Sequence, residues 1–495
     1  MLHAAMLPLA NVQLWVTPLW ILSLGVTAAV VILAILYGLM VVAWPAGAQA
    51  VRQAAGDGLL TPIAAVAAAF VLLTLLATAS MPLDDVWASL QRKPTTGPHQ
   101  ETFTIEANAV DQPLEVDIRA DELMGYILAT DGDLRLSTEA GRGFAAVDFT
   151  LTGGEDYEWD PAKKYPRIFQ DRITTLYATN PNEVPISLTF DYETDVEMPE
   201  VHHLPVITLS IVGVVLLYFL LEVIFPGVAT VAVGTAKEAI SQPLFLVLTG
   251  IGAVALVLYI FIPYHTFGED VKMLTDSGLT TIMVLGILFA LWTSSTSVSD
   301  EIEGKTALTM LSKPVSRRQF VLGKFLGILW PLLVMFVILG AILLITISYK
   351  VVYDARESSQ PTPDWQLCYS TMVSAIPGLV LAYMQAAVLA AVSVAISTRL
   401  SMLPNLIIVG SIYVIGNLLP QIVRSSAGDI PFIAFTGKLL SVVLPVLNHF
   451  NIQPAISAGM PVPYTYLLMA GLYCLLYCTA AMLLALLLFE DRDLA

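Results

Sequence analysis

The chain has 495 residues, of which 57% are hydrophobic and 13% are charged, and its mean hydropathy is +0.76. Soluble globular domains carry about 25% charged residues, so this composition excludes an ordinary soluble protein. The 40 acidic and 23 basic residues give a net charge of −17. A balance this acidic argues against a nucleic-acid partner, because nucleic-acid-binding surfaces are basic.

Apolar stretches recur along the chain, and each is long enough to cross a hydrocarbon core about 30 Å thick. The first lacks a preceding basic segment and is too long for a signal peptide, so we expect it to be retained. We therefore predict an α-helical, multi-pass membrane protein. The nine candidate spans are 17–44, 60–80, 205–225, 244–263, 278–296, 321–347, 371–397, 403–420 and 466–489.

A polar segment, 82–204, separates the second span from the third. It contains 24 acidic and nine basic residues and no cysteine, so it must fold without disulfides. Short alternating stretches separated by turn residues predict a compact β-rich domain, similar to a sandwich. Its carboxylates suit a solvated face, and a cation or a basic partner is the alternative. The stretches are 102–107, 114–120, 134–137, 146–151, 173–178 and 184–192.

Charge predicts the orientation. Five of the 23 basic residues lie between Asp300 and Lys324, in a short loop beside two spans. Basic residues in short loops mark the cytoplasmic side, so we place this loop inside. Counting spans from it places 82–204 outside the cell membrane and the C-terminus in the cytoplasm. The first two spans give little charge signal, since Arg52 and Asp57 lie together in their connecting loop.

The segment Asp300 to Lys324 also contains helix start and stop signals. Pro314 predicts the end of one short helix, because proline lacks an N–H and clashes with the preceding turn. Ser316 and Gln319 have the spacing of a capping box, which predicts a sharply started helix immediately afterwards. The loop therefore has the local order expected of a docking surface for a partner.

Motifs for catalysis or metal binding are not convincing here. Gly304-Lys305-Thr306 imitates the end of a phosphate-binding loop, but Ser299 stands where the first glycine belongs and no buried strand precedes it. We predict no ATPase, and no enzyme, in this chain. His202 and His203 beside Met198 invite a copper site, but we favour surface residues. Cys474 and Cys478 are better explained as small apolar residues of a helix than as ligands.

Polar residues inside predicted spans are the usual place to look for transport chemistry. Glu222 near the inner end of the third span suits either a helix-end partner or substrate handling. The amides suit either a transport path or hydrogen bonds between helices. The scarcity of charge in the last six spans favours an amphipathic cargo. The candidate residues are Glu222, Gln385, Asn405 and Asn417.

Residues 232–495 resemble the ABC-2 type transporter permease family, and most closely its permeases related to multi-copper enzyme maturation (nitrous-oxide reductase) and gliding motility. Lys237 and Glu238 before Pro243 resemble the elbow helix of that family. The C-terminal run Phe489 to Leu494 resembles its closing F-x-x-R-D. Residues 297–324 resemble its coupling loop, through Glu301, Glu303, Gly304, Thr306, Leu308, Leu311, Pro314, Arg317 and Arg318. Lys305 belongs to the same predicted docking site but departs from the family pattern, because it separates Gly304 from Thr306, which the family writes side by side.

The resemblance implies a dimeric permease that docks a separate ATPase subunit, which would hold the ATP and Mg²⁺; this chain would hold no cofactor. Together with the span pattern, which lies outside the resemblance before residue 232, we expect four parts: two spans (1–81), the β-rich domain (82–204), a third span (205–231) and a six-span core (232–495). Glu301 and Glu303 suit basic residues of the ATPase, or they complement a helix dipole. Leu308 and Leu311 are spaced for one apolar stripe.

Three functions remain open at this point. The first is an ABC exporter permease driven by the separate ATPase. The second is an ABC-type complex that transmits force to an extracytoplasmic partner without moving a cargo. The third is a membrane scaffold or receptor that works without ATP.

Overall fold

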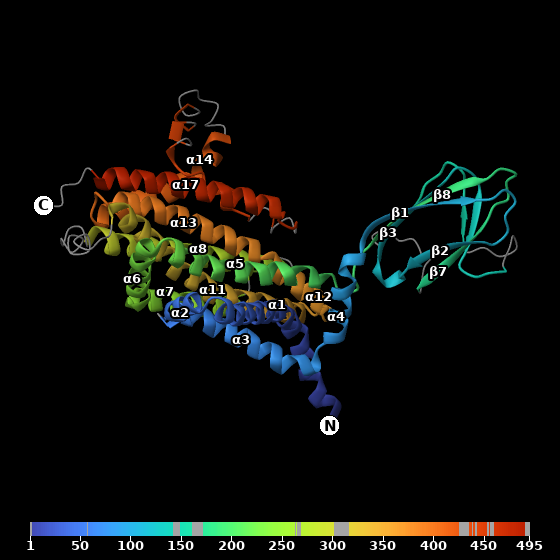
Figure 1. The fold of residues 1–495 in the computed structure, drawn as a ribbon, viewed down its shortest axis with the longest axis horizontal. Coiled ribbons are helices and arrows are strands. Elements are labelled where there is room, and N and C mark those ends of the chain that lie inside the picture. The colour runs from blue at the N-terminus through green and yellow to red at the C-terminus, as the bar shows by residue number, and fades with distance from the viewer. Residues whose placement is uncertain are drawn as a thin grey trace. The chain divides into compact units, whose positions relative to one another are not determined.

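The computed structural model describes residues 2–56, 58–141, 149–160, 172–262, 264, 269–300, 316–424, 435–437, 439–440, 443–452, 455 and 460–490. The chain forms two compact units. One comprises Met1–Ala77 and Val206–Ala495, and the other comprises Thr78–Pro205 (Figure 1). The loop residues Glu301 to Pro314, which carry most of the predicted docking site, lie outside the described residues.

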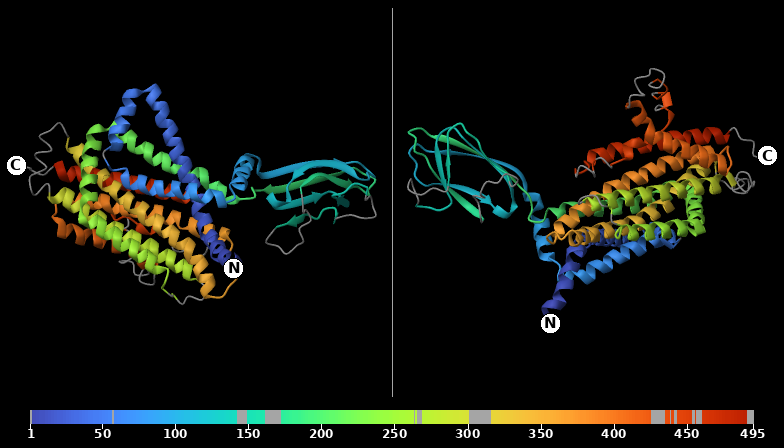
Figure 2. Two further views of the ribbon diagram at one scale, coloured as in Figure 1. Left: turned by 90° about the horizontal axis from the view of Figure 1, so that it is seen from below. Right: turned by 180° about the vertical axis from the view of Figure 1, so that it is seen from behind.

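The larger unit is helical, and Figure 2 shows that most of its long helices run side by side. Its helices are α1 (Leu2–Ala43), α2 (Pro45–Gly56), α3 (Thr61–Ala77), α5 (His203–Ile224), α6 (Pro226–Ser241), α7 (Pro243–Tyr259), α8 (Asp270–Ser294), α11 (Arg317–Glu357), α12 (Trp365–Ser374), α13 (Ile376–Ser397), α14 (Met402–Arg424) and α17 (Tyr464–Glu490). A π-helical turn, η5 (Ser295–Asp300), extends α8, and a 3-10 turn, η7 (Leu447–Phe450), lies between α14 and α17.

Every predicted span falls on a helix or on a pair of helices. Within the described residues, seven helical segments are long and apolar enough to cross a bilayer. The pair α6 and α7 makes an eighth if the two count as one span, although they are bent by 60° at Gln242. The apolar part of α14, Met402–Leu418, is shorter. The chain is therefore a multi-pass membrane protein.

Helices α8, α11 and α13 form the centre of this unit, and α17 packs along α13. The N-terminal helices join the same bundle. The hydroxyl of Ser348 on α11 donates to the carbonyl of Trp15 on α1 at 2.8 Å, and the indole N–H of Trp330 donates to the carbonyl of Leu59 at 3.1 Å. Helix α5 is tied to α1 through Thr208. Helices α1, α3 and α5 are thus part of one helical unit with the helices that follow them.

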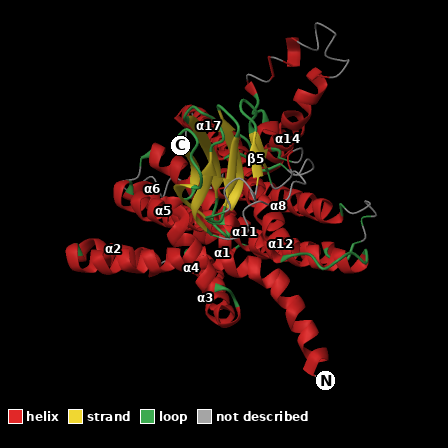
Figure 3. Cartoon of the chain, turned by 90° about the vertical axis from the view of Figure 1, so that its right-hand side faces the viewer, coloured by secondary structure: helices red, strands yellow, loops and turns green. Residues whose placement is uncertain are grey.

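The smaller unit is a β-sandwich of two four-stranded antiparallel sheets, whose strands are yellow in Figure 3. One sheet has the order β1-β8-β3-β6 and the other β2-β7-β4-β5. Helix α4 (Leu83–Arg92) precedes the first strand. The strands are β1 (Gly97–Ile105), β2 (Gln112–Ile118), β3 (Leu123–Thr130), β4 (Leu134–Ser137), β5 (Phe149–Leu151), β6 (Tyr157–Trp159), β7 (Ile173–Thr179) and β8 (Ile186–Thr194).

Alternation builds the core of the sandwich. Successive side chains of a strand point to opposite faces, so every second residue of β2 and β8 is buried. Leu114, Leu128, Leu176 and Phe190, from four strands and both sheets, are each less than 5% exposed. The sandwich therefore has a hydrophobic core of its own, as the sequence pattern predicts.

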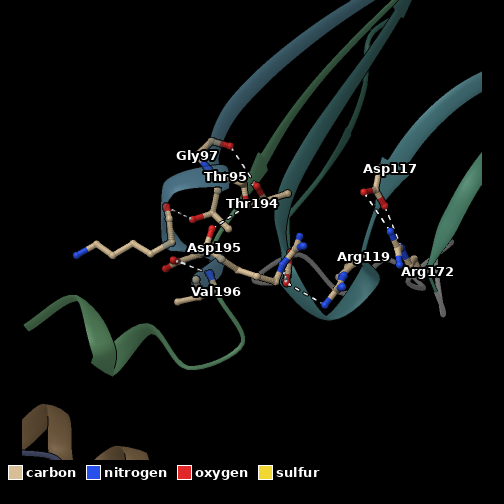
Figure 4. Close-up of polar contacts among 12 residues, drawn as sticks. Thr95, Gly97, Asp117, Arg119, Arg172, Thr194, Asp195 and Val196 are labelled. Atoms are coloured by element: carbon tan, nitrogen blue, oxygen red, sulfur yellow. Dashed lines mark hydrogen bonds and ion pairs between the residues drawn. The ribbon is translucent and has the colours of Figure 1, made fainter. Parts of the chain in front are cut away.

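Two ion pairs join segments of the smaller unit that are far apart in the sequence. The guanidinium of Arg92 at the end of α4 contacts the buried carboxylate of Glu122, with its Nη2 2.6 Å from Oε2. Arg172 makes a bidentate pair with Asp117 at 3.0 and 3.2 Å (Figure 4). The guanidinium of Arg172 lowers the pKa of Asp117. His202 was considered above as a copper ligand. Its Nε2 lies 2.6 Å from Oδ1 of Asp195.

Candidate functional site at the coupling end of the bundle

Four chain segments meet at one end of the helical unit, which we call the coupling end: 294–300, 316–327, 397–405 and 489–490. The hydroxyl of Ser299 donates to the carbonyl of Leu400 at 3.1 Å, which joins the first segment to the third. Helix α11 contacts α17, which joins the second to the fourth. The segment 301–315 leaves from, and returns to, this end.

Helix α11 starts with a complete capping box. The backbone N–H of Gln319 donates to the Ser316 hydroxyl at 3.2 Å, and the Gln319 side chain accepts from the Ser316 N–H at 2.9 Å. Ser316 itself is extended, with φ −74° and ψ 156°. Such a cap contributes about 1 kcal/mol and satisfies two otherwise unpaired N–H groups. The start of α11, directly after the loop, is thus fixed by its own sequence.

Arg317 connects this start to the C-terminal end of α17. Its Nη1 donates to the carbonyl of Glu490 at 2.9 Å, and its guanidinium lies 5.7 Å from the ring centroid of Phe489. The last carbonyls of a helix have no partner within the helix, and they carry partial negative charge that favours a cation. Arg317 therefore clamps the end of α17 against the residue that begins α11.

Beneath this clamp lies an aromatic pair. Phe320 and Phe489 stack with their centroids 5.7 Å apart, and both side chains are fully buried. Lys324, one turn further along α11, is only 1% exposed, and its Nζ lies 5.7 Å from the Phe320 ring. Displacing the end of α11 would expose these rings, so α11 and α17 are expected to move together.

Helix α6 crosses α11 at very short range. A Cβ built on Gly323 would lie 2.6 Å from the Cβ of Val231, and one on Gly327 would lie 2.7 Å from the carbonyl of Ala232. The two glycines are four residues apart, so they share one face of α11 and let the backbones touch. Lys237 and Glu238 of the predicted elbow helix are exposed on α6.

A buried hydroxyl–amide cluster joins the end of α8 to α13 and α14. The Asn405 side-chain NH₂ lies 2.7 Å from the Ser295 hydroxyl, 2.8 Å from that of Ser393 and 2.9 Å from that of Ser397. Ser294 is also hydrogen-bonded to Ser393. All five side chains are fully buried. They lie beside the π-helical turn η5, and such turns are frequent at functional sites.

The structure separates the residues predicted from the sequence into groups. Ser316, Arg317 and Gln319 make hydrogen bonds at the coupling end, and Arg318 is exposed beside them. Asn405 belongs to the cluster of the coupling end, where it makes hydrogen bonds between helices. Gln385 and Asn417 line a cavity elsewhere in the bundle. Glu222 is half-buried on α5. The docking residues outside the described part are Glu301, Glu303, Gly304, Lys305, Thr306, Leu308, Leu311 and Pro314.

Three features escaped the sequence reasoning. Lys324 and Lys350 are buried in α11, so the region predicted as the six-span core holds more buried charge than expected. Asp276, which precedes the predicted start of its span, lines the cavity with Gln385. The serine cluster had a visible signal, because the stretch from Thr293 to Ser299 is rich in serine and threonine at the end of a span.

Comparison with known proteins gives a family. A model described as "ABC-2 family transporter protein" matches residues 206–494, which is more than half of the chain. No curated protein matches the chain. The match includes every helix from α6 to α17 and the coupling end, and it leaves out the β-sandwich and the first two helical spans. The chain therefore belongs to the ABC-2 transporter family and is a multi-pass membrane subunit of an ABC transporter.

Proposed function

We propose that this subunit is the permease of an ABC exporter, driven by ATP hydrolysis in a separate ATPase subunit that docks on residues 297–324. ATP and Mg²⁺ belong to that partner, and two permease copies or homologues pair in the membrane. The coupling end is the observation that carries the proposal, because it connects the segment around the loop to several helices at once.

The described contacts connect both ends of the loop 301–315 to the helices of the bundle. A movement of the loop 301–315 acts on η5 at one end and on the capped start of α11 at the other. From η5 the hydrogen bonds of Asn405 reach α13 and α14. From α11 the Arg317 clamp reaches α17, and Gly323 and Gly327 reach α6. Work delivered at this loop is therefore passed through α11 and η5 to four further helices, α6, α13, α14 and α17.

The same end of the bundle supports the proposed orientation. The contact of Arg317 with Glu490 joins the start of α11, with Arg317 and Arg318, to the C-terminal end of α17. Basic residues in a short loop favour the cytoplasmic side. On this proposal the loop and the C-terminus are cytoplasmic, and the acidic β-sandwich lies on the opposite, extracytoplasmic side.

Co-purification tests the docking. We expect an ATPase subunit to be retained by the wild-type permease and lost from Glu303→Arg, because the reversed charge repels the basic residues of the partner. Glu357→Arg makes the same change at the other end of α11 and is expected to retain the ATPase. The measurement is the ATPase-to-permease ratio after affinity purification. Equal ratios in all three proteins would remove Glu303 from the interface, and recovery of no ATPase would favour the scaffold function.

A second candidate function is force transmission to an extracytoplasmic partner. The sandwich has a hydrophobic core of its own, and the ion pair between Arg92 and Glu122 joins α4 to it, which suits a domain that carries load. Vesicles containing the permease and its ATPase separate the two functions. The exporter consumes ATP and moves cargo, whereas the force-transmitting complex consumes ATP without cargo flux.

A further inference from the structure

A cavity of about 180 Å³ lies in the half of the helical unit away from the coupling end. Residues of α8, α13, α14, η7 and the segment after η7 form its walls. Asp276 is separated from Ser294 by 18 positions of α8, which corresponds to about 27 Å along a helix. Within the described part of the chain, none of the assigned docking residues lines the cavity.

Its walls are part polar and part apolar. Asp276, Gln385, Asn417 and Asn451 contribute a carboxylate and three amides. The remaining lining includes Phe450 and other apolar side chains. This combination is typical of ligand sites, in which a few placed polar groups fix the orientation of a molecule held by apolar contacts.

Gln385 is the strongest sign that something binds there. Its side chain is 2% exposed, and its Nε2 has no hydrogen-bond partner in the described part of the chain. A buried amide left without a partner is costly because it has lost its hydrogen bonds to water, so such groups are rare unless they serve a purpose. An acceptor atom of a ligand would satisfy this donor.

The remaining polar groups select the charge of the ligand. Asp276 is the only acidic or basic residue that lines the cavity in the described part of the chain. Asn417 donates to the carbonyl of Tyr413 at 2.9 Å, which commits one of its N–H groups and leaves its oxygen as an acceptor. A carboxylate and an amide oxygen favour a cationic donor, and they disfavour an anion.

Size limits the ligand further. A volume of 180 Å³ equals that of about six liquid waters at about 30 Å³ each. Pockets for drug-sized ligands have volumes of about 300–1,000 Å³, so this cavity suits a small group and not a whole amphiphile. We propose that this cavity binds a primary ammonium group that carries a nearby acceptor oxygen, such as the head group of an aminophospholipid or a small soluble amino alcohol.

This proposal deepens the proposed function by naming a class of cargo. It depends on that function only for the step from binding to transport. The test below contains neither the ATPase subunit nor ATP, so failure of binding and failure of ATP coupling are observed in different experiments.

The soluble source is tested with the full chain in nanodiscs of phosphatidylcholine. We expect ethanolamine to raise the unfolding temperature saturably, and sodium acetate at equal ionic strength to have no such effect. Asp276→Asn and Gln385→Leu are expected to weaken ethanolamine binding at least tenfold. Asp270→Asn, which makes the same change on the same helix outside the cavity, is expected to change it less than twofold.

The lipid source is tested with nanodiscs that contain equal amounts of phosphatidylethanolamine and phosphatidylcholine, followed by mass spectrometry of the retained lipid. Retention of phosphatidylethanolamine by wild type and its loss from Asp276→Asn supports a head group as the ligand. Saturable ethanolamine binding without lipid enrichment supports a soluble amine. The proposal is overturned if wild type neither binds ethanolamine saturably nor retains phosphatidylethanolamine. It is also overturned if acetate binds as well as ethanolamine, or if Asp276→Asn binds like wild type.

Discussion

At the scale of single residues, Arg317 makes the contacts that join the start of α11 to the end of α17. Its guanidinium reaches the last carbonyls of α17 and the face of Phe489, and the adjacent Ser316 fixes where α11 begins. The capping box was readable from the sequence, because its partners are three residues apart. The clamp was not, since Arg317 and Glu490 are separated by 173 positions and no local pattern connects them.

We predict that Arg317→Ala loosens the end of α17. Removing the cation leaves the last carbonyls of α17 without their donor, at a cost of about 1 kcal/mol. Hydrogen exchange of the peptide that ends at Glu490 should therefore become faster. Arg318→Ala removes the neighbouring charge, which makes no such contact within the described residues, and should leave that exchange unchanged. Equal exchange in both variants would contradict the clamp.

In the β-sandwich, Tyr192 makes stability depend on alkaline pH. Burial and the hydrogen bond to Glu101 raise the pKa of Tyr192 to about 12. The ordinary pKa of tyrosine is about 10, so the folded state holds the proton more tightly than the unfolded state. Its contribution is complete below pH about 10 and is lost as the pH rises toward about 12.

Tyr192→Phe tests this dependence, because phenylalanine has no proton to lose. Between pH 10 and 12, where the two pKa values lie, the free energy of unfolding of the excised unit Thr78–Pro205 should fall less steeply in the variant. Urea titrations at several pH values give that free energy. An equally steep fall in both proteins would show that Tyr192 does not hold its proton preferentially in the folded state.

At the scale of elements, the contact with α11 determines how α6 is held in the bundle. Gly323 and Gly327 provide the flat face, and their four-residue spacing is visible in the sequence. That this face packs on α6 was not predictable, because small residues on several helices suit the same face.

The spans were predictable from the sequence, because a long apolar run needs no partner to be recognised. Strands β3 and β6 were missed, since β3 contains Gly125 within a nearly continuous apolar run and β6 has three residues.

Gly323→Ala should destabilise this crossing. The new methyl group would lie 2.6 Å from the Cβ of Val231 and 2.9 Å from the carbonyl of Val228, so the helices must separate. Overpacking of this kind costs about 1–3 kcal/mol, which a lower unfolding temperature in detergent would show. Gly250→Ala adds the same methyl group to α7, where no atom lies within 4 Å. A Gly323→Ala variant as stable as Gly250→Ala would mean that α6 and α11 do not approach closely.

At the scale of the whole molecule, the chain combines a family bundle with a sandwich that the family match does not include. Composition and hydropathy predicted the class of protein, and ordered motifs predicted the family. The cavity could not be predicted, because Asp276, Gln385 and Asn417 come from three helices and only packing brings them together. The function of the whole depends on which side of the membrane the coupling end faces.

Cysteine labelling measures that directly. In a variant without Cys368, Cys474 and Cys478, a single Arg318→Cys should react with a membrane-impermeant maleimide only after the membrane is opened. Glu139→Cys in the sandwich should react in intact cells. This pattern would place the loop where a cytoplasmic ATPase can reach it. Labelling of Arg318→Cys in intact cells would put the loop outside and contradict the proposed coupling.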